Sequence, residues 1–142
     1  MINQKALIGM GSNIEPEANL KRAAATIKGY FPEARFSKVY RSAAVGMAGD
    51  DFLNACCLIE TGMSERDLRR WLKGVEDEHD RDRRQGSWQP RTLDLDLLML
   101  GDTVLDEDVY EYAHASVPAA ELVDMEFPAT DSNILTLQPL RL

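Results

Sequence analysis

The sequence is poor in several residue types that particular classes of protein require, and the first of these is cysteine. Its two cysteines, Cys56 and Cys57, are adjacent and lie in an apolar stretch. Adjacent cysteines do not have the spacing of a metal site and rarely form a disulfide with each other. The sequence therefore gives no sign of a disulfide-stabilised secreted domain or a zinc module, and we expect two buried free thiols.

Long apolar runs and an excess of basic residues are also missing. No run approaches the roughly 20 apolar residues that cross a bilayer, and the first residues lack the basic and apolar regions of a signal peptide. The formal net charge of −8 disfavours broad attraction to nucleic acid or anionic membranes. We therefore predict a cytoplasmic protein that acts on small molecules, without nucleic-acid or membrane partners, as a monomer or else a dimer.

What remains is the composition of an ordinary globular protein. Of the 142 residues, 44% are hydrophobic and 28% are charged, which is typical of a domain that buries its own core. The sequence has no repeat, linker or low-complexity tract that would divide it. Residues 1–142 are expected to form a single domain.

Hydrophobic periodicity predicts an alternation of strands and helices over the first hundred residues. Runs rich in β-forming residues predict four strands, at 5–10, 35–41, 52–61 and 88–100. Apolar residues at helical spacing predict two helices, at about 16–31 and 64–79. This β-α-β-β-α-β order is that of ferredoxin-like folds, so we predict an α+β protein with an antiparallel sheet and helices on one face. A short C-terminal extension follows.

The last predicted strand, WQPRTLDLDLLML at 88–100, carries a pair of carboxylates on one face. With a period of two residues, Asp94 and Asp96 point to the same side, followed by Leu98 and Leu100. The opposite side carries only apolar residues: Leu93, Leu95, Leu97 and Met99. Two carboxylates on Cα atoms roughly 6.5–7 Å apart can bind Mg²⁺, which takes one or two protein carboxylates and leaves other positions to water or phosphate. The alternative is a solvated pair without a ligand.

Other positions admit both a ligand-binding and a structural interpretation. The loop before this strand collects four arginines: Arg81, Arg83, Arg84 and Arg91. Such a loop in an acidic protein is typical of nucleotide binding, or else is simply solvated. The small, Gly-containing loop at 42–51 could cover a site, and Asn54 could read the edge of a flat heterocycle or bond nearby backbone. Trp88 could stack on a ring or anchor its loop, and His114 could contact phosphate or be structural.

These features together resemble one known family. The run WQPRTLDLDLL at 88–98 closely resembles the WGPRTLDLDLL motif of the 6-hydroxymethyl-7,8-dihydropterin pyrophosphokinases, with Gln89 in place of a glycine. The runs IGMGSN at 8–13, YRSAAVG at 40–46 and DFLNA at 51–55 are similar to the family's opening strand, flap and next strand, in the family's order. The resemblance therefore covers roughly the first hundred residues.

The resemblance implies a specific activity and a specific set of site residues. Enzymes of this family transfer the pyrophosphoryl group of ATP to the hydroxymethyl group of a reduced pterin, releasing AMP, on the route to folate. By position, Asp94 and Asp96 would bind two Mg²⁺ ions, and Arg83 and Arg91 would join them in catalysis. The pterin would be bound by Ser42, Ala43, Val45, Phe52, Asn54 and Trp88. The co-substrate ATP would be bound by Glu76, Arg83, Trp88, Arg91 and His114.

The sequence also departs from the family's pattern. Ala43 and Ala44 replace flap residues that usually include proline, which should loosen the flap, and Asp80 replaces a glycine. After His114, a segment that carries an ATP-contacting arginine and a pterin-stacking phenylalanine looks deleted, and the pattern resumes at Val117. We therefore keep three predictions open: an active pyrophosphokinase, a pterin- or nucleotide-binding relative with weak or no activity, and a regulatory module unrelated to pterins.

Overall fold

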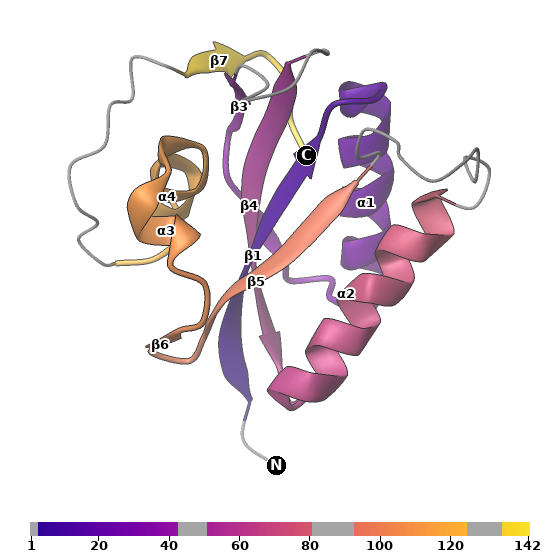
Figure 1. Cartoon of the computed structure of the whole chain (residues 1–142). Helices are drawn as coiled ribbons and strands as arrows, with labels where there is room; N and C mark the ends of the chain where they lie inside the picture. The colour runs from indigo at the N-terminus through magenta and orange to yellow at the C-terminus, as the bar shows by residue number, and fades with distance from the viewer. Residues whose placement is uncertain (1–2, 43–50, 81–92, 125–134) are drawn as a thin grey trace, which may run out of the picture.

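The computed structural model describes residues 3–42, 51–80, 93–124 and 135–142, and it has one antiparallel β-sheet between two helical layers (Figure 1). The strands are β1 (Gln4–Ser12), β2 (Arg35–Phe36), β3 (Val39–Ser42), β4 (Phe52–Thr61), β5 (Asp94–Leu100), β6 (Thr103–Val104) and β7 (Thr136–Gln138). The helices are α1 (Pro16–Tyr30), α2 (Glu65–Asp80), α3 (Asp108–Glu111) and α4 (Ala113–Ala120). The sheet order is β6-β5-β1-β4-β3-β7, and β2 pairs separately with β4.

The strands β1 and β4 form the centre of the sheet. β1 pairs with β4 along its whole length, and β5 pairs with the other edge of β1. The partial order β5-β1-β4-β3 is that of the predicted ferredoxin-like arrangement, so the α+β prediction is confirmed. β4 has the predicted bounds, and its cysteines, Cys56 and Cys57, are buried free thiols as expected.

One face of the sheet is covered by α1 and α2 (Figure 1). The apolar stripes of the two helices join the larger core cluster: Leu20, Ala23 and Ile27 from α1, and Leu68, Leu72 and Val75 from α2. Ser64 caps the N-terminus of α2, because its Oγ accepts a hydrogen bond from the backbone N–H of Asp67 at 3.1 Å. None of the helices in the described ranges is long and apolar enough to cross a membrane.

The opposite face is partly covered by α3 and α4, which come from the C-terminal extension (Figure 1). They pack on a second, smaller cluster: Leu7, Cys56, Leu58, Leu98, Met99, Val109 and Ala119. Glu121, just after α4, fixes this layer to the sheet, because its carboxylate accepts hydrogen bonds from the Lys38 N–H at 3.0 Å and the Tyr40 hydroxyl at 2.6 Å. Burial and this carboxylate raise the pKa of Tyr40 to about 12. The extension is thus a second helical layer.

The predicted strand at 35–41 is interrupted after two residues. The break at Ser37 and Lys38 separates β2 from β3, although both pair with β4. The Oγ of Ser37 accepts a hydrogen bond from the Cys56 N–H at 2.8 Å, while the Ser37 N–H donates to the Cys56 carbonyl at 2.9 Å. The Ser37 hydroxyl therefore takes the place of a backbone acceptor in the hydrogen-bond ladder with β4. Hydrophobic periodicity in the sequence does not reveal such a replacement.

A β-bulge in β5 changes the face of two residues. Leu97 and Met99 pair with neighbouring residues of β1, so Leu98 is an extra residue on β5. As a result, Leu98 and Met99 both pack on the α3/α4 side, and Leu100 turns to the α1/α2 side. The uninterrupted alternation predicted from the sequence is correct through Leu98 and wrong for Met99 and Leu100.

Candidate active site

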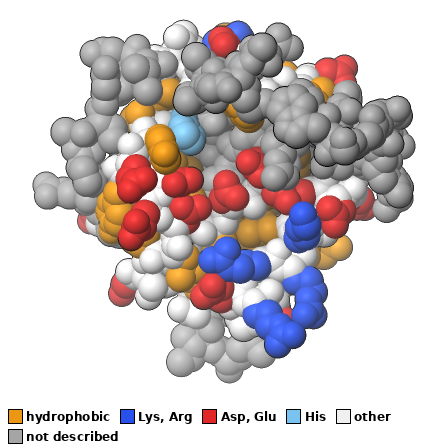
Figure 2. Space-filling model, viewed as in Figure 1, with side chains coloured by type: hydrophobic (Ala, Val, Ile, Leu, Met, Phe, Trp, Pro, Cys, Tyr) orange, Lys and Arg blue, Asp and Glu red, His pale blue; other side chains and the backbone are white. Residues whose placement is uncertain are grey.

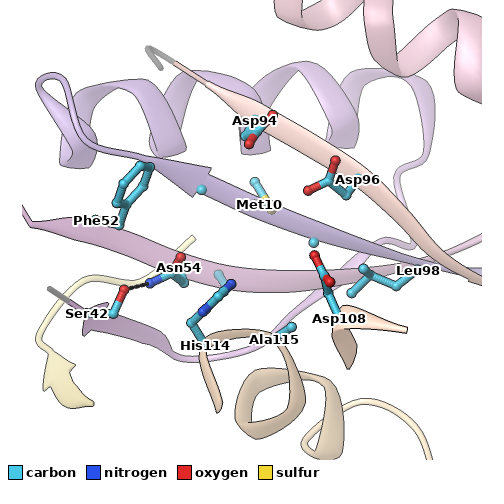
Figure 3. Close-up of a pocket in the computed structure, with 13 residues that line it drawn as sticks. Met10, Ser42, Phe52, Asn54, Asp94, Asp96, Leu98, Asp108, His114 and Ala115 are labelled. Atoms are coloured by element: carbon cyan, nitrogen blue, oxygen red, sulfur yellow. Dashed lines mark hydrogen bonds between the residues drawn. The ribbon is translucent and has the colours of Figure 1, made fainter. Parts of the chain in front are cut away.

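The central strand β1 has two residues without side chains on the α3/α4 side of the sheet. Gly9 and Gly11 alternate with core residues, so their missing side chains leave a hollow in the sheet surface. A cavity of about 300 Å³ lies there, with walls from β3, β4, β5, α3 and α4 (Figure 3). A Cβ at Gly9 would come within 3.2 Å of Leu98, and one at Gly11 within 3.5 Å of the Asn54 amide oxygen. Glycine at these positions therefore keeps the floor open.

Strand register places polar residues on either side of this floor. Gly11 is the partner of Asn54 on β4 and of Asp94 on β5, and Gly9 is the partner of Asp96. Neighbouring strands are about 4.8 Å apart, so the backbones of Asn54 and Asp94 are separated by roughly 10 Å across an empty position. The cavity thus has a carboxylate wall on β5 and an amide wall on β4.

The carboxylate wall concentrates negative charge. The side chain of Asp96 keeps contact with solvent. Its pKa is nevertheless raised to about 6, mainly by partial burial and in second place by the charges of Asp94 and other nearby carboxylates. Figure 2 shows Asp and Glu side chains in a row across the middle of the view, with Lys and Arg side chains below the row. The described stretch 93–124 contains no lysine or arginine at all. A carboxylate pair in this setting favours a bound cation, because burial and like charges both disfavour the bare anions.

The amide wall is held in one orientation by hydrogen bonds. The Nδ2 of Asn54 donates to the Oγ of Ser42 at 2.8 Å and to the Tyr40 carbonyl at 3.4 Å, and only 6% of Asn54 is exposed. Its Oδ1 is thereby turned toward Gly11 and the cavity floor. Phe52, two residues earlier on β4, lines the same cavity. The wall therefore offers a fixed hydrogen-bond acceptor beside an aromatic ring.

His114 enters the cavity from the helical layer. It lies in the first turn of α4, and its ring is stacked on Tyr112 with centroids 5.4 Å apart and an interplanar angle of 22°. Burial lowers the pKa of His114, and the charge of Asp108 on α3 acts in the opposite direction. A neutral imidazole can both donate and accept hydrogen bonds. This wall can therefore contact an anionic group without repelling a cation beside it.

Comparison with known proteins identifies the family. The sequence profile described as 7,8-dihydro-6-hydroxymethylpterin-pyrophosphokinase matches residues 7–129. The chain belongs to this family. Relatives named 2-amino-4-hydroxy-6-hydroxymethyldihydropteridine pyrophosphokinase include those of Synechocystis sp. (34% identity, covering 93% of this chain and 73% of the relative), Pseudomonas aeruginosa (32%, 84% and 76%) and Campylobacter jejuni (36%, 87% and 79%). The protein is therefore an enzyme of the pyrophosphokinase type, as the resemblance implied.

The family resemblance singled out twelve site residues, and six of them line this same cavity: Ser42, Phe52, Asn54, Asp94, Asp96 and His114. Five others lie outside the described residues, and their roles stay predictions: Ala43, Val45, Arg83, Trp88 and Arg91. Asp108 also lines the cavity and was missed, because one acidic residue in an acidic stretch carries no spacing signal. In the part of the chain that the structure describes, no group of three or more His, Cys, Asp or Glu side chains is placed to hold a metal ion.

Glu76, assigned to ATP by the family resemblance, does not line the cavity. Its buried carboxylate accepts a hydrogen bond from the backbone N–H of Leu95 at 2.7 Å. Leu95 lies between the two aspartates of β5. β6 pairs only with Met99 and Leu100, so no strand among the described residues pairs with the outer edge of β5 at this point. Glu76 therefore contacts the backbone of β5 at the position between Asp94 and Asp96, the two aspartates of the carboxylate wall.

Proposed function

We propose that this chain transfers the pyrophosphoryl group of ATP to the hydroxymethyl group of 6-hydroxymethyl-7,8-dihydropterin, with release of AMP and with Mg²⁺ as cofactor. The observation that carries the proposal is the cavity over Gly9 and Gly11, where a carboxylate pair and an oriented amide face each other from two strands of one sheet. Membership of the pyrophosphokinase family supports the reaction class and a place in folate biosynthesis.

The amide wall has the chemistry that binds a pterin. A reduced pterin is a flat ring with an edge of N–H donors, and the Oδ1 of Asn54 is an acceptor turned into the cavity. Ser42 keeps that amide in place, and Phe52 supplies an apolar surface for the ring. With the pterin edge on Asn54, its hydroxymethyl group would point across the floor toward the aspartates. The predicted contacts of Ala43, Val45 and Trp88 with the pterin belong to the same proposal.

The carboxylate wall fits Mg²⁺ by its donor set. It offers only oxygen donors, and the pKa of Asp96 is raised because partial burial and then nearby carboxylates disfavour its charged form. Asp94 and Asp96 would hold two Mg²⁺ ions, with ATP phosphates and water as the remaining ligands. When bound, Mg²⁺ would neutralise phosphate charge and align the attacking and leaving oxygens. In this proposal Arg83 and Arg91 compensate the charge of the transferred group, and Glu76, Trp88 and His114 contribute to the ATP site.

A second candidate is a binding protein that keeps the cavity with little or no turnover. The stretch 93–124 that includes α3 and α4 lacks lysine and arginine, so this layer cannot compensate the charge of a triphosphate. The family resemblance also implies that a segment directly after His114 is deleted. In both cases the charge of the ATP triphosphate would have to be compensated by Mg²⁺ and by the arginines before β5 alone.

One experiment separates the candidates. The protein is titrated calorimetrically with 6-hydroxymethyl-7,8-dihydropterin and with α,β-methylene-ATP in the presence of Mg²⁺, and AMP release from ATP is then measured with the pterin present. We expect both ligands to bind and AMP to appear only with pterin and Mg²⁺. Binding of both ligands without AMP would favour the second candidate, and binding of neither would remove both. The cytoplasmic location and the monomeric or dimeric state stay predictions.

A change to the cavity floor tests where the pterin lies. Gly11→Val would place a branched side chain between Asn54 and Asp94, while a β-branched residue suits a strand. We expect dihydropterin affinity to fall by roughly tenfold or more, equivalent to about 1.4 kcal/mol, with little change in Tm. Gly74→Ala is the matched control, because a Cβ at Gly74 on α2 meets nothing within 4 Å. Equal affinities of the two variants would place the pterin elsewhere.

A further inference from the structure

The structure contains one aromatic contact at the cavity that the proposed function does not use. Tyr112 is the residue before α4, and 48% of it is exposed, yet its ring lies over His114 at a centroid distance of 5.4 Å and an angle of 22°. His114 lines the cavity and Tyr112 does not. A solvent-facing tyrosine is therefore placed against the outer side of a cavity residue.

The backbone between α3 and α4 builds this pair. Residues two apart point in different directions on a continuous helix and do not meet. Tyr112, however, has extended backbone (φ −119°, ψ 129°), and α4 begins only after it. The N–H groups of Ala115 and Ser116 donate to the Tyr112 carbonyl at 3.0 and 2.9 Å, which ties its backbone to the first turn of α4. The position of the Tyr112 ring over His114 is thus set by the start of this helix.

A stacked neighbour restricts the one torsion of histidine that is otherwise loose. The χ2 angle of histidine has a broad, roughly two-fold distribution, so an unsupported imidazole turns easily. With one ring face against Tyr112, the imidazole of His114 keeps its plane, and its edge stays directed to the cavity, as Figure 3 shows for the His114 side chain. Figure 3 also shows Asp108 directed into the same cavity.

We infer that Tyr112 is a positioning residue that holds the His114 imidazole in the orientation in which it contacts the phosphates of ATP. This inference rests on the proposed function, because it takes the ATP contact of His114 from it. Tyr112 touches no substrate itself and acts through the ring of its neighbour. The contact is made in the ground state, so its loss weakens ATP binding more than it slows the chemical step.

Steady-state kinetics test this role. Tyr112→Ala should raise the KM for ATP roughly 3- to 10-fold, with little change in kcat or in the KM for the pterin, because a stacked pair contributes a modest free energy. Tyr112→Phe should restore the KM, and Tyr112→Leu, which keeps bulk without a flat ring, should not. In a His114→Ala background, Tyr112→Ala should have no further effect. Tyr30→Ala is the control, because Tyr30 is an exposed aromatic residue, 66% accessible, that packs on Trp71.

A spectroscopic measurement tests the positioning independently of activity. The chain has two histidines, His79 and His114, so His79→Gln assigns both imidazole proton signals. The His114 signal should be shifted upfield by the Tyr112 ring in the wild type and in Tyr112→Phe, and should lose that shift in Tyr112→Ala. An unmoved signal would overturn the inference, as would a moved signal with an unchanged KM for ATP. If the wild type itself released no AMP, the proposed function would fail and the assignment of ATP to this pair would fail with it.

Discussion

Replacing Asp96 with asparagine is expected to abolish pyrophosphoryl transfer while leaving the fold intact. Asp96 lies on the cavity face of β5, opposite Gly9, and its side chain is directed into the cavity (Figure 3). An amide has nearly the same shape as a carboxylate but is a much weaker Mg²⁺ ligand, so turnover should fall on the order of 10³-fold. AMP release under saturating ATP and pterin measures the effect. Turnover near that of the wild type would contradict the metal-binding role.

The same variant should be more stable than the wild type when no metal is present. The pKa of Asp96 is raised from 3.8 to about 6 by burial and by nearby carboxylates. Between these values the folded protein keeps a proton that the unfolded chain has lost, so the wild type loses stability as the pH rises from about 4 to 6. Asparagine does not titrate and avoids this loss.

Thermal melting in EDTA measures the difference. The Tm of Asp96→Asn should exceed that of the wild type by about 1–3 °C above pH 6, a small effect because Asp96 keeps contact with solvent, and the two should converge near pH 4. Mg²⁺ with α,β-methylene-ATP should raise the Tm of the wild type only. Asp102→Asn, in the exposed turn before β6, is the control. A lower Tm for Asp96→Asn at pH 7 would show that the charge is already compensated without metal.

The elements that follow local periodicity could be predicted from the sequence. β4 was predicted with its observed bounds, because Phe52–Thr61 is a largely apolar run between two Gly-containing segments. The common face of Asp94 and Asp96 follows from the two-residue period of a strand. The order of these elements was enough for the α+β fold. The cavity itself could not be predicted, because it depends on the register that sets Gly9 and Gly11 between the polar residues of β4 and β5.

The features that depend on distant contacts could not be predicted in this way. The bulge at Leu98 arises from register against β1, and residues 97–100 are all apolar, so the local pattern gives no sign of which face each of them takes. The α3/α4 layer has no helical period of its own and is held by Glu121, which bonds to residues more than 80 positions earlier. Asp108 reaches the cavity only because of that docking.

Replacing Glu76 with alanine is expected to destabilise the protein by about 2 kcal/mol and to lower its Tm by roughly 5–8 °C. The variant removes the acceptor of the Leu95 N–H, which no strand within the described ranges pairs with at the outer edge of β5. A buried N–H without a partner has a cost of about 1–3 kcal/mol. Because Leu95 lies between Asp94 and Asp96, looser backbone here should also reduce kcat. Thermal melting and AMP release measure the two effects.

Replacing Glu76 with glutamine distinguishes a structural role from an ATP contact. Glutamine keeps an acceptor for the Leu95 N–H but loses the charge, so most of the stability should return, with a small deficit because a neutral acceptor binds more weakly. The charge of Glu76 is also one cause of the raised pKa of Asp96, so that pKa should fall, and the acid limb of the pH–rate profile should move to lower pH. If Glu76 instead contacts ATP, the glutamine variant should raise the KM for ATP at unchanged Tm. That result would support the ATP contact that the family resemblance implied for Glu76.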